Sequence, residues 1–206
     1  MRPRAGLRRR QPPLLLWHGA GVDATTWDAL IPHLRSFRVV CQDLPGDGRS
    51  PLPHLTVSDV IADGEVVVED LGLGDPVLAF SMGGWAALHF AASHPCRALV
   101  CLDGPTNLDY REMGLRADHP GFVPDPPDPR ADFASLRCPA TVVLCKGPSP
   151  EEAEWMVPFR TGLADYLTRT LPQIRVEWLA TGHMLILSQP ATTADLINRF
   201  AGEARG

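Results

Sequence analysis

The residues best placed for chemistry are centred on Ser81, in the sequence Ala-Phe-Ser-Met-Gly-Gly at positions 79–84. An apolar, strand-like segment comes directly before it, and a segment with helical spacing comes directly after. A sharp strand-to-helix turn needs small residues on both sides of its centre, because the flanking backbones nearly touch. Such a turn exposes the central side chain above a helix N-terminus, which favours negative charge. The pattern predicts that Ser81 is a nucleophile; the structural alternative is that it caps the helix.

Two further segments follow predicted strands and contain glycine beside histidine. His18-Gly19-Ala20-Gly21 closes the first strand with a flexible turn whose amides can face the serine, and Gly182-His183 follows the last strand. In a parallel sheet all carboxyl ends lie at one edge, where open α/β proteins bind ligands. The order of strands therefore predicts that His183 lies beside Ser81, in preference to being a histidine of a surface loop.

The elements that must position these residues alternate along the chain. Short apolar or β-branched runs predict six strands, at residues 14–17, 37–41, 77–80, 98–102, 141–145 and 175–179. Helical spacing is found at residues 25–34, 56–71, 82–94, 151–171 and 190–201, with Pro158 expected to interrupt the fourth of these helices. Continuously apolar strands alternating with helices are typical of an α/β fold, in which a mostly parallel central sheet is flanked by helices on both faces.

Composition limits the function classes. The chain has 206 residues, 45% hydrophobic and 21% charged, which predicts one globular domain over residues 1–206. With a formal net charge of −5, the chain has no overall positive field that would attract nucleic acid. No apolar run is long enough to span a membrane. The five cysteines are an odd number and lack a CxxC pair, so we expect free thiols and a cytoplasmic location. The arginines before residue 11 are interpreted as a solvated basic arm rather than an export signal.

Residues 104–140 break the alternation of strands and helices. This segment is rich in proline and aspartate, and its periodicity is weak outside residues 108–115. It is too long for an ordinary connection, which predicts a short Pro-rich lid or an excursion over the edge of the sheet. The run Pro-Asp-Pro-Pro-Asp-Pro at 124–129 is expected to be extended and poor in secondary structure.

The order and spacing of these motifs resemble the α/β-hydrolase superfamily over nearly the whole chain. The matching stretches are WHGAGVDATTW (17–27), DLPGDGRS (43–50), AFSMGG (79–84), SHP (93–95) and TGHMLILSQP (181–190). The resemblance implies that Ser81 is the nucleophile and His183 the general base. It also implies that the backbone amides of Ala20 and Met82 form an oxyanion hole, an arrangement that stabilises charge developing on a carbonyl oxygen.

The acid of the triad is the main departure from the family pattern. The usual position, soon after the strand at 141–145, holds no aspartate, although Glu151 and Glu152 follow it. The family has a second solution, in which the acid ends the strand after the nucleophile helix, and that position here is Asp103. We favour Asp103 over Glu151 or Glu152, while aspartate is also common there as a turn former. A triad without an acid stays open.

Other expectations concern the loops and the ends of the sheet. Within DLPGDGRS, the residues Asp43, Asp47 and Arg49 are interpreted as a turn-fixing polar network rather than as catalytic groups. Only 13 residues precede the first strand, so we expect the opening antiparallel strands of this fold to be reduced or missing. Sheet edges left open in this way are compatible with a homodimer.

The resemblance implies a serine hydrolase that cleaves a small-molecule ester, thioester or lactone through an acyl-enzyme intermediate. No cofactor or metal is implied, and neither nucleic acid nor membrane is an expected partner. Two alternatives stay open. One is another enzyme on the same scaffold, acting by acyl transfer, C–C bond cleavage or cyclisation, and the other is a catalytically silent small-molecule-binding protein.

Overall fold

A computed structural model describes residues 11–19, 21–50, 56–74, 77–80, 82–106, 108, 128–147 and 156–203 of the chain. Its centre is a six-stranded sheet in which every neighbouring pair is parallel, in the order β2-β1-β3-β4-β5-β6. The strands are β1 (Pro13–Trp17), β2 (Arg38–Gln42), β3 (Val77–Phe80), β4 (Leu99–Leu102), β5 (Ala140–Cys145) and β6 (Arg175–Leu179). Each of the six predicted strands is present to within one residue at either end.

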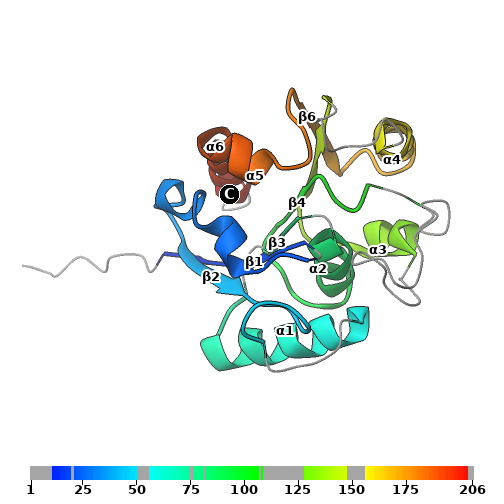
Figure 1. Ribbon diagram of the computed structural model, residues 1–206. Helices are drawn as coiled ribbons and strands as arrows, with labels where there is room; N and C mark the ends of the chain where they lie inside the picture. Colours follow the sequence, from blue (N-terminus) through cyan, green and yellow to red (C-terminus); the bar gives the residue numbers. More distant parts are fainter. Residues whose placement is uncertain are drawn as a thin grey trace, which may run out of the picture.

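Helices cover both faces of this sheet, as Figure 1 shows. The helices α1, α2, α3 and α4 lie on one side, and α5 and α6 lie on the other together with two 3-10 turns, η1 and η2. Their bounds are α1 Val57–Leu71, α2 Met82–Ser93, α3 Pro129–Ser135, α4 Met156–Thr170, α5 Leu185–Ser188, α6 Pro190–Glu203, η1 Ala24–Trp27 and η2 Ile31–His33. The predicted fold class is confirmed.

The inner strands β1, β4 and β5 are buried on both faces, whereas the edge strands β2 and β6 are only partly buried. Successive side chains of a strand point to opposite sides of a pleated sheet. On β1, Leu15 and Trp17 enter the core beneath α1 and α2, whereas Leu14 and Leu16 enter the core beneath α5 and α6. All four are at most 2% exposed. A strand that contributes to two cores has no polar face, which is why the sequence shows continuous apolar runs rather than alternation.

Local signals explain why α1 begins and ends where it does. Thr56 accepts a hydrogen bond from the amide of Asp59, and the Asp59 carboxylate accepts one from the amide of Thr56. This reciprocal capping box satisfies two amides that have no partner within the helix. At the other end Gly72 has a φ of 60°, a left-handed conformation that costs glycine little.

Three predictions about helices are wrong in detail. Residues 25–34 form the short 3-10 turns η1 and η2 instead of an α-helix. Pro158 does not interrupt α4, because it lies in the first turn, where an amide would have no acceptor inside the helix. The helix α3 was not predicted; it begins at Pro129, with Asp128 as its N-cap, at the end of a run expected to lack secondary structure.

Several other expectations meet the structure only in part. All five cysteines are free. In the part of the chain that the structure describes, no helix combines the length and apolar character needed to cross a membrane. The expectation of reduced or missing opening strands concerns residues 1–10, and most of the predicted lid is residues 109–127; both segments lie outside the described residues.

Candidate active site

Asp103 is the first residue after β4, and it is buried rather than being part of an exposed turn. Its amide donates to the carbonyl of Val143 on β5, over 2.7 Å, so the β4–β5 pairing extends to this residue. Its φ of 52° is the one left-handed non-glycine conformation among the described residues. Aspartate tolerates this conformation better than most residues, at a cost of about 1–2 kcal/mol. A fully buried carboxylate on a strained turn is typical of a functional position.

His183 follows β6 and points back toward the end of β4. Its Nδ1 lies 2.7 Å from Oδ2 of Asp103, and its side chain keeps 21% exposure. The turn that carries it is closed by a 3.1 Å hydrogen bond between the hydroxyls of Thr181 and Ser188. Since β5 separates β4 from β6 in the sheet, the two residues meet across the end of β5.

Four donors converge on the Asp103 carboxylate. The Cys145 amide and Nε of Arg160 each donate to Oδ1 over 2.9 Å, and Nη2 of Arg160 donates to Oδ2, which also faces His183. Burial alone would raise the pKa of Asp103, but hydrogen bonds from and positive charge on His183 and Arg160 outweigh it and hold that pKa below its usual range. The carboxyl is therefore ionised at neutral pH. Arg160 is not among the residues that the sequence motifs predict for the site.

The amino end of α2 lies against the backbone that follows Asp103. The helix begins at Met82, one position after Ser81 in the sequence, and its first amides have no acceptor within the helix. A Cβ at Gly84 would lie 2.5 Å from the carbonyl carbon of Gly104, so the first turn of α2 is packed on the backbone that follows Asp103. The predicted site residues Ser81 and Ala20, and the alternative acids Glu151 and Glu152, lie outside the described residues.

The contact at Gly84 leads to a prediction about stability. We expect Gly84→Ala to destabilise the protein by about 1–3 kcal/mol, because the added methyl group would overlap the backbone of Gly104 and shift the Asp103 turn. Gly162 on α4 is a matched control, since a Cβ there meets nothing within 4 Å. Gly162→Ala is expected to stabilise the helix by about 0.5–1 kcal/mol. Urea denaturation measures both, and equal stability of Gly84→Ala and wild type would contradict the described packing.

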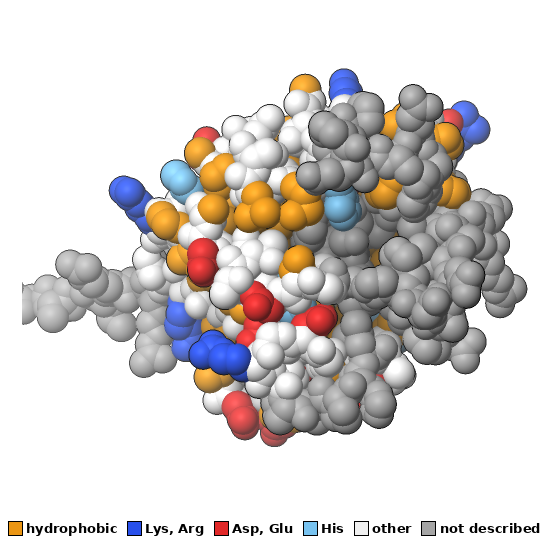
Figure 2. All heavy atoms as spheres, viewed as in Figure 1, with side chains coloured by type: hydrophobic (Ala, Val, Ile, Leu, Met, Phe, Trp, Pro, Cys, Tyr) orange, Lys and Arg blue, Asp and Glu red, His pale blue; other side chains and the backbone are white. Residues whose placement is uncertain are grey.

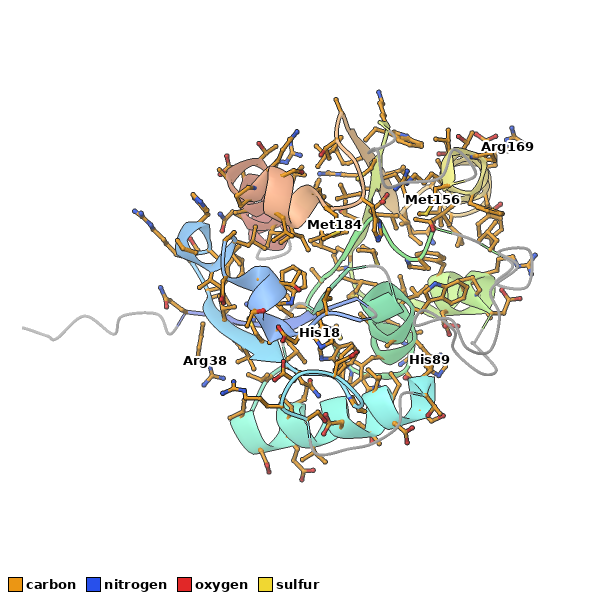
Figure 3. All side chains as sticks on the ribbon, in the orientation of Figure 1. His18, Arg38, His89, Met156, Arg169 and Met184 are labelled. Carbon is orange, nitrogen blue, oxygen red and sulfur yellow. The ribbon has the colours of Figure 1, made fainter. Side chains whose placement is uncertain are left out.

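The turns after β1 and β2 are tied together by two polar side chains. The buried imidazole of His18 accepts from the Leu44 amide at Nε2, over 2.9 Å, and therefore donates from Nδ1 to the carbonyl of Gly19. Asp43 accepts from the amides of Ala24 and Arg49, over 2.8 and 2.9 Å. Figure 3 shows His18 near the centre of the molecule, between η1 and α1. The predicted turn-fixing role is confirmed for Asp43.

Asp43 supplies a second testable prediction. Its hydrogen bonds with the Ala24 and Arg49 amides lower the pKa of its carboxyl, so its stabilising contribution is present above the unfolded pKa, near roughly 4, and is lost as pH falls through the folded value. We expect Asp43→Ala to cost about 1–3 kcal/mol at pH 7 and progressively less below pH 4. Asp165→Ala is the control, because Asp165 forms an exposed 3.4 Å pair with Arg169. A pH-independent difference between Asp43→Ala and wild type would contradict this role.

Acidic side chains gather at the carboxyl ends of β1 and β2. Asp23, Asp43 and Asp47 are close enough to influence one another, and burial followed by the charges of Asp23 and Asp43 raises the pKa of Asp47. On the face of the molecule shown in Figure 2, acidic side chains cluster near the middle, below a group of hydrophobic side chains. The edge of the sheet that holds Asp103 and His183 thus has a negative neighbourhood on its β1–β2 side.

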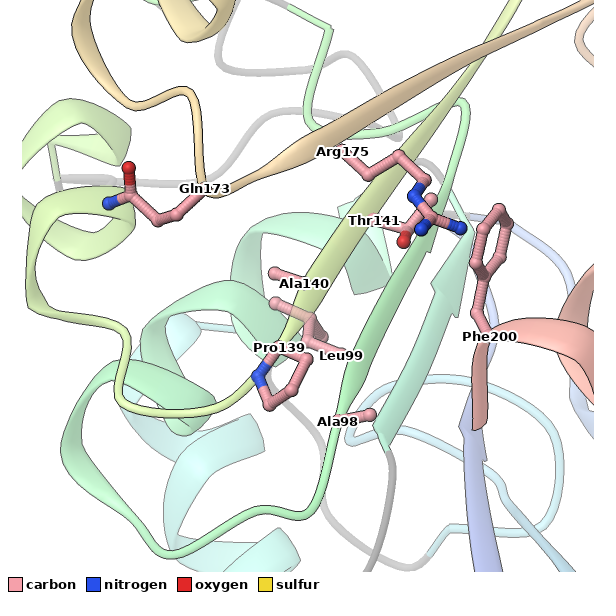
Figure 4. A pocket seen from close by; sticks show the side chains of 8 residues that line it. All are labelled: Ala98, Leu99, Pro139, Ala140, Thr141, Gln173, Arg175 and Phe200. Carbon is pink, nitrogen blue, oxygen red and sulfur yellow. The ribbon is translucent and has the colours of Figure 1, made fainter. Parts of the chain in front are cut away.

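A hollow of about 170 Å³ lies at the opposite edge of the sheet (Figure 4). It is lined by residues at the amino ends of β4, β5 and β6, including Leu99, Thr141 and Arg175, and by Phe200 of α6. Asp103 and His183 follow the carboxyl ends of strands in the same sheet. The hollow is therefore separate from the candidate active site. We place that site at the carboxyl edge because the contact between Asp103 and His183 lies there.

Comparisons with known proteins identify the family to which this chain belongs. A family model described as "Alpha/beta hydrolase family" matches residues 14–164. The pimeloyl-[acyl-carrier protein] methyl ester esterase of Aeromonas hydrophila is 38% identical over 87 residues, 42% of this chain and 34% of the relative. Lipase LipV of Mycobacterium tuberculosis is 32% identical over 130 residues, 59% of this chain and 49% of the relative. The matches thus span between a third and a half of these curated relatives.

Solved structures agree on the fold. A hypothetical protein of Pseudomonas aeruginosa PAO1 has a TM-score of 0.73 and 19% identity, with 97% of this chain and 93% of that chain covered. A lipase-esterase related protein of Clostridium acetobutylicum has a TM-score of 0.70 and 18% identity, with 93% and 95% covered. With the parallel sheet and the helices on both of its faces, these matches lead to one conclusion: the chain belongs to the alpha/beta hydrolase family.

Proposed function

We propose that this protein hydrolyses carboxylic esters of small, uncharged molecules through an acyl-enzyme intermediate on Ser81. The observation that carries the proposal is the 2.7 Å contact between Nδ1 of His183 and the ionised, buried carboxylate of Asp103. The backbone that follows Asp103 packs on the first turn of the helix that begins directly after Ser81. The names of two curated relatives, a methyl ester esterase and a lipase, support ester chemistry.

In the proposed reaction His183 moves the protons. Its Nδ1 donates to Asp103, which leaves Nε2 as the ring nitrogen that can accept a proton. As the Ser81 hydroxyl attacks the ester carbonyl, Nε2 takes its proton, and the Asp103 carboxylate stabilises the imidazolium that forms. The proton then passes to the departing alcohol, leaving an acyl-enzyme on Ser81. Water attacks that ester with His183 again as base, which releases the acid and restores the hydroxyl.

The developing negative charge on the carbonyl oxygen requires hydrogen-bond donors. The proposal assigns this role to the backbone amides of Met82, the first residue of α2, and Ala20. His18 supports the turn before Ala20, because its Nδ1 holds the carbonyl of Gly19 over 2.7 Å. The acidic side chains that follow β1 and β2 favour neutral over anionic substrates at this edge of the sheet.

Hydrolysis in H₂¹⁸O tests the proposal and separates it from its rivals. With p-nitrophenyl butyrate as substrate, we expect nitrophenol release and one ¹⁸O atom in the butyrate, because water cleaves the acyl-enzyme. The anionic mono-p-nitrophenyl suberate, whose carboxylate is too far from the ester to close a small ring, is expected to be cleaved more slowly than the neutral p-nitrophenyl octanoate. Release of nitrophenol without formation of butyric acid would indicate transfer of the acyl group to an acceptor other than water, and absence of turnover with any ester would favour a binding protein.

A further inference from the structure

Arg160 occupies an unusual place for a charged side chain. It lies in the first turns of α4 and is fully buried, on the same helix face as the buried Leu163, Ala164 and Leu167. Residues three, four and seven positions apart share one face of a helix, so Arg160 stands where an apolar residue would be expected. Burying a guanidinium is costly unless a partner takes its charge and its hydrogen bonds.

The partner is the carboxylate that also faces His183. Nε of Arg160 donates to Oδ1 of Asp103 over 2.9 Å, and Nη2 donates to Oδ2, so the guanidinium makes a bidentate contact with the carboxylate. Such a two-pronged contact fixes the plane of a carboxylate as well as its position. The same Oδ2 receives Nδ1 of His183 over 2.7 Å. The bidentate contact with Arg160 therefore fixes the orientation of the Asp103 carboxylate relative to the imidazole of His183.

We propose that Arg160 is a positioning residue of the active site, which orients the Asp103 carboxylate and keeps it ionised for His183. This inference rests on the proposed hydrolase function. Arg160 acts through Asp103, so its part in the reaction is to hold the imidazole in the tautomer that leaves Nε2 ready to accept the serine proton.

The charges around Asp103 give the sign of the expected effect. Among the described residues, the charged or titratable groups that face its carboxylate are Arg160 from α4 and His183 from the turn after β6, while β5 contributes the uncharged amide of Cys145. Burial raises the pKa of Asp103, and hydrogen bonds and charge from His183 and Arg160 lower it. Removing Arg160 takes away one of the two groups that lower the pKa of Asp103 against the effect of burial. The Asp103–His183 pair then takes up its proton at higher pH.

The test compares Arg160→Gln and Arg160→Lys with wild type by two independent readouts. The first is the pH dependence of kcat/KM with p-nitrophenyl butyrate, and the second is the ¹³Cγ NMR titration of Asp103, assigned through Asp103→Asn. For Arg160→Gln we expect both the acid limb and the carboxyl titration to move up by about 1 pH unit or more. We also expect kcat to fall by about 10- to 100-fold at a nearly unchanged KM, since binding groups are not touched.

Two further variants sharpen the result. Arg160→Lys keeps the charge but not the two-pronged geometry, so we expect its acid limb to return close to that of wild type while kcat recovers only in part. Arg169→Gln is the matched control on the same helix, because Arg169 is 78% exposed in its pair with Asp165. Figure 3 shows Arg169 at the periphery of the molecule. This control is expected to leave both readouts unchanged.

The outcomes separate this inference from the proposed function. A wild-type Asp103 titration and a wild-type pH profile in Arg160→Gln would overturn the role of Arg160 and leave the hydrolase intact. An inactive wild type would overturn the hydrolase, while the NMR titration still decides whether Arg160 keeps Asp103 ionised. If Arg160→Gln does not fold, Arg160→Lys decides: a loss of kcat supports the role, and unchanged kcat and titration overturn it.

Discussion

Replacing Ser81 with alanine is expected to reduce kcat for ester hydrolysis by about 10⁴- to 10⁶-fold. The proposed reaction divides one difficult step into two through a covalent ester on the Ser81 hydroxyl, and alanine has no atom that can form this bond. Any activity that remains comes from the groups that bind the ester and stabilise the oxyanion, acting on water. KM is expected to change little, since the hydroxyl contributes mainly in the transition state.

The measurement is steady-state hydrolysis of p-nitrophenyl butyrate by Ser81→Ala and wild type in parallel, with folding verified by circular dichroism. Ser93 provides a matched control, because its hydroxyl donates to the carbonyl of His89 at the end of α2, away from the first turn of that helix. Ser93→Ala is expected to keep kcat within about twofold of wild type. Substantial turnover by Ser81→Ala would exclude the acyl-enzyme on Ser81.

Replacing Asp103 with asparagine is expected to reduce kcat by about 10³- to 10⁴-fold. Asparagine has nearly the same shape but no charge, so it cannot stabilise the imidazolium of His183 when the serine proton is transferred. Each carboxylate oxygen of Asp103 accepts from two donors, so the NH₂ group of asparagine would face a donor in either orientation. When the NH₂ group faces His183, Nδ1 of the imidazole must accept, and the ring proton moves to Nε2, which then has no lone pair for the serine proton.

The same substitution leaves Arg160 buried opposite a neutral partner, which costs about 3–5 kcal/mol of stability. Kinetics must therefore be measured at a temperature where Asp103→Asn is folded, which thermal denaturation establishes. Glu151→Gln and Glu152→Gln test the alternative acids, and both are expected to retain activity within a few-fold of wild type. Loss of activity in either glutamine variant, with full activity in Asp103→Asn, would move the acid to that glutamate.

The sheet was predictable because its strands leave an unambiguous pattern. The strands at Val77–Phe80 and Arg175–Leu179 have the predicted bounds. The first is a short apolar run, and in the second apolar residues alternate with Arg175 and Glu177; both lie between glycine- or proline-containing segments. The parallel order then brings Asp103 and His183 to one edge without any further information. What the sequence could not supply is that Asp103 is buried, because aspartate at the end of a strand is equally common on exposed turns.

The position of Arg160 in the sequence of α4 indicates burial, although no prediction was based on it. On α4 it is part of the stripe that continues through Leu163, Ala164 and Leu167, so a charge interrupts an otherwise apolar face. That pattern indicates a buried charge with a partner, although only the fold identifies the partner as Asp103. The N-cap Asp128 and Pro129 at the first position were likewise a start signal for α3, hidden in a proline-rich run.

Intact mass spectrometry after exposure to a fluorophosphonate probe detects an activated serine nucleophile. If Ser81 is that nucleophile, we expect one covalent adduct on the wild-type chain, none on Ser81→Ala, and slower labelling of Asp103→Asn. Absence of labelling on wild type, or undiminished labelling of Ser81→Ala, would contradict that role of Ser81.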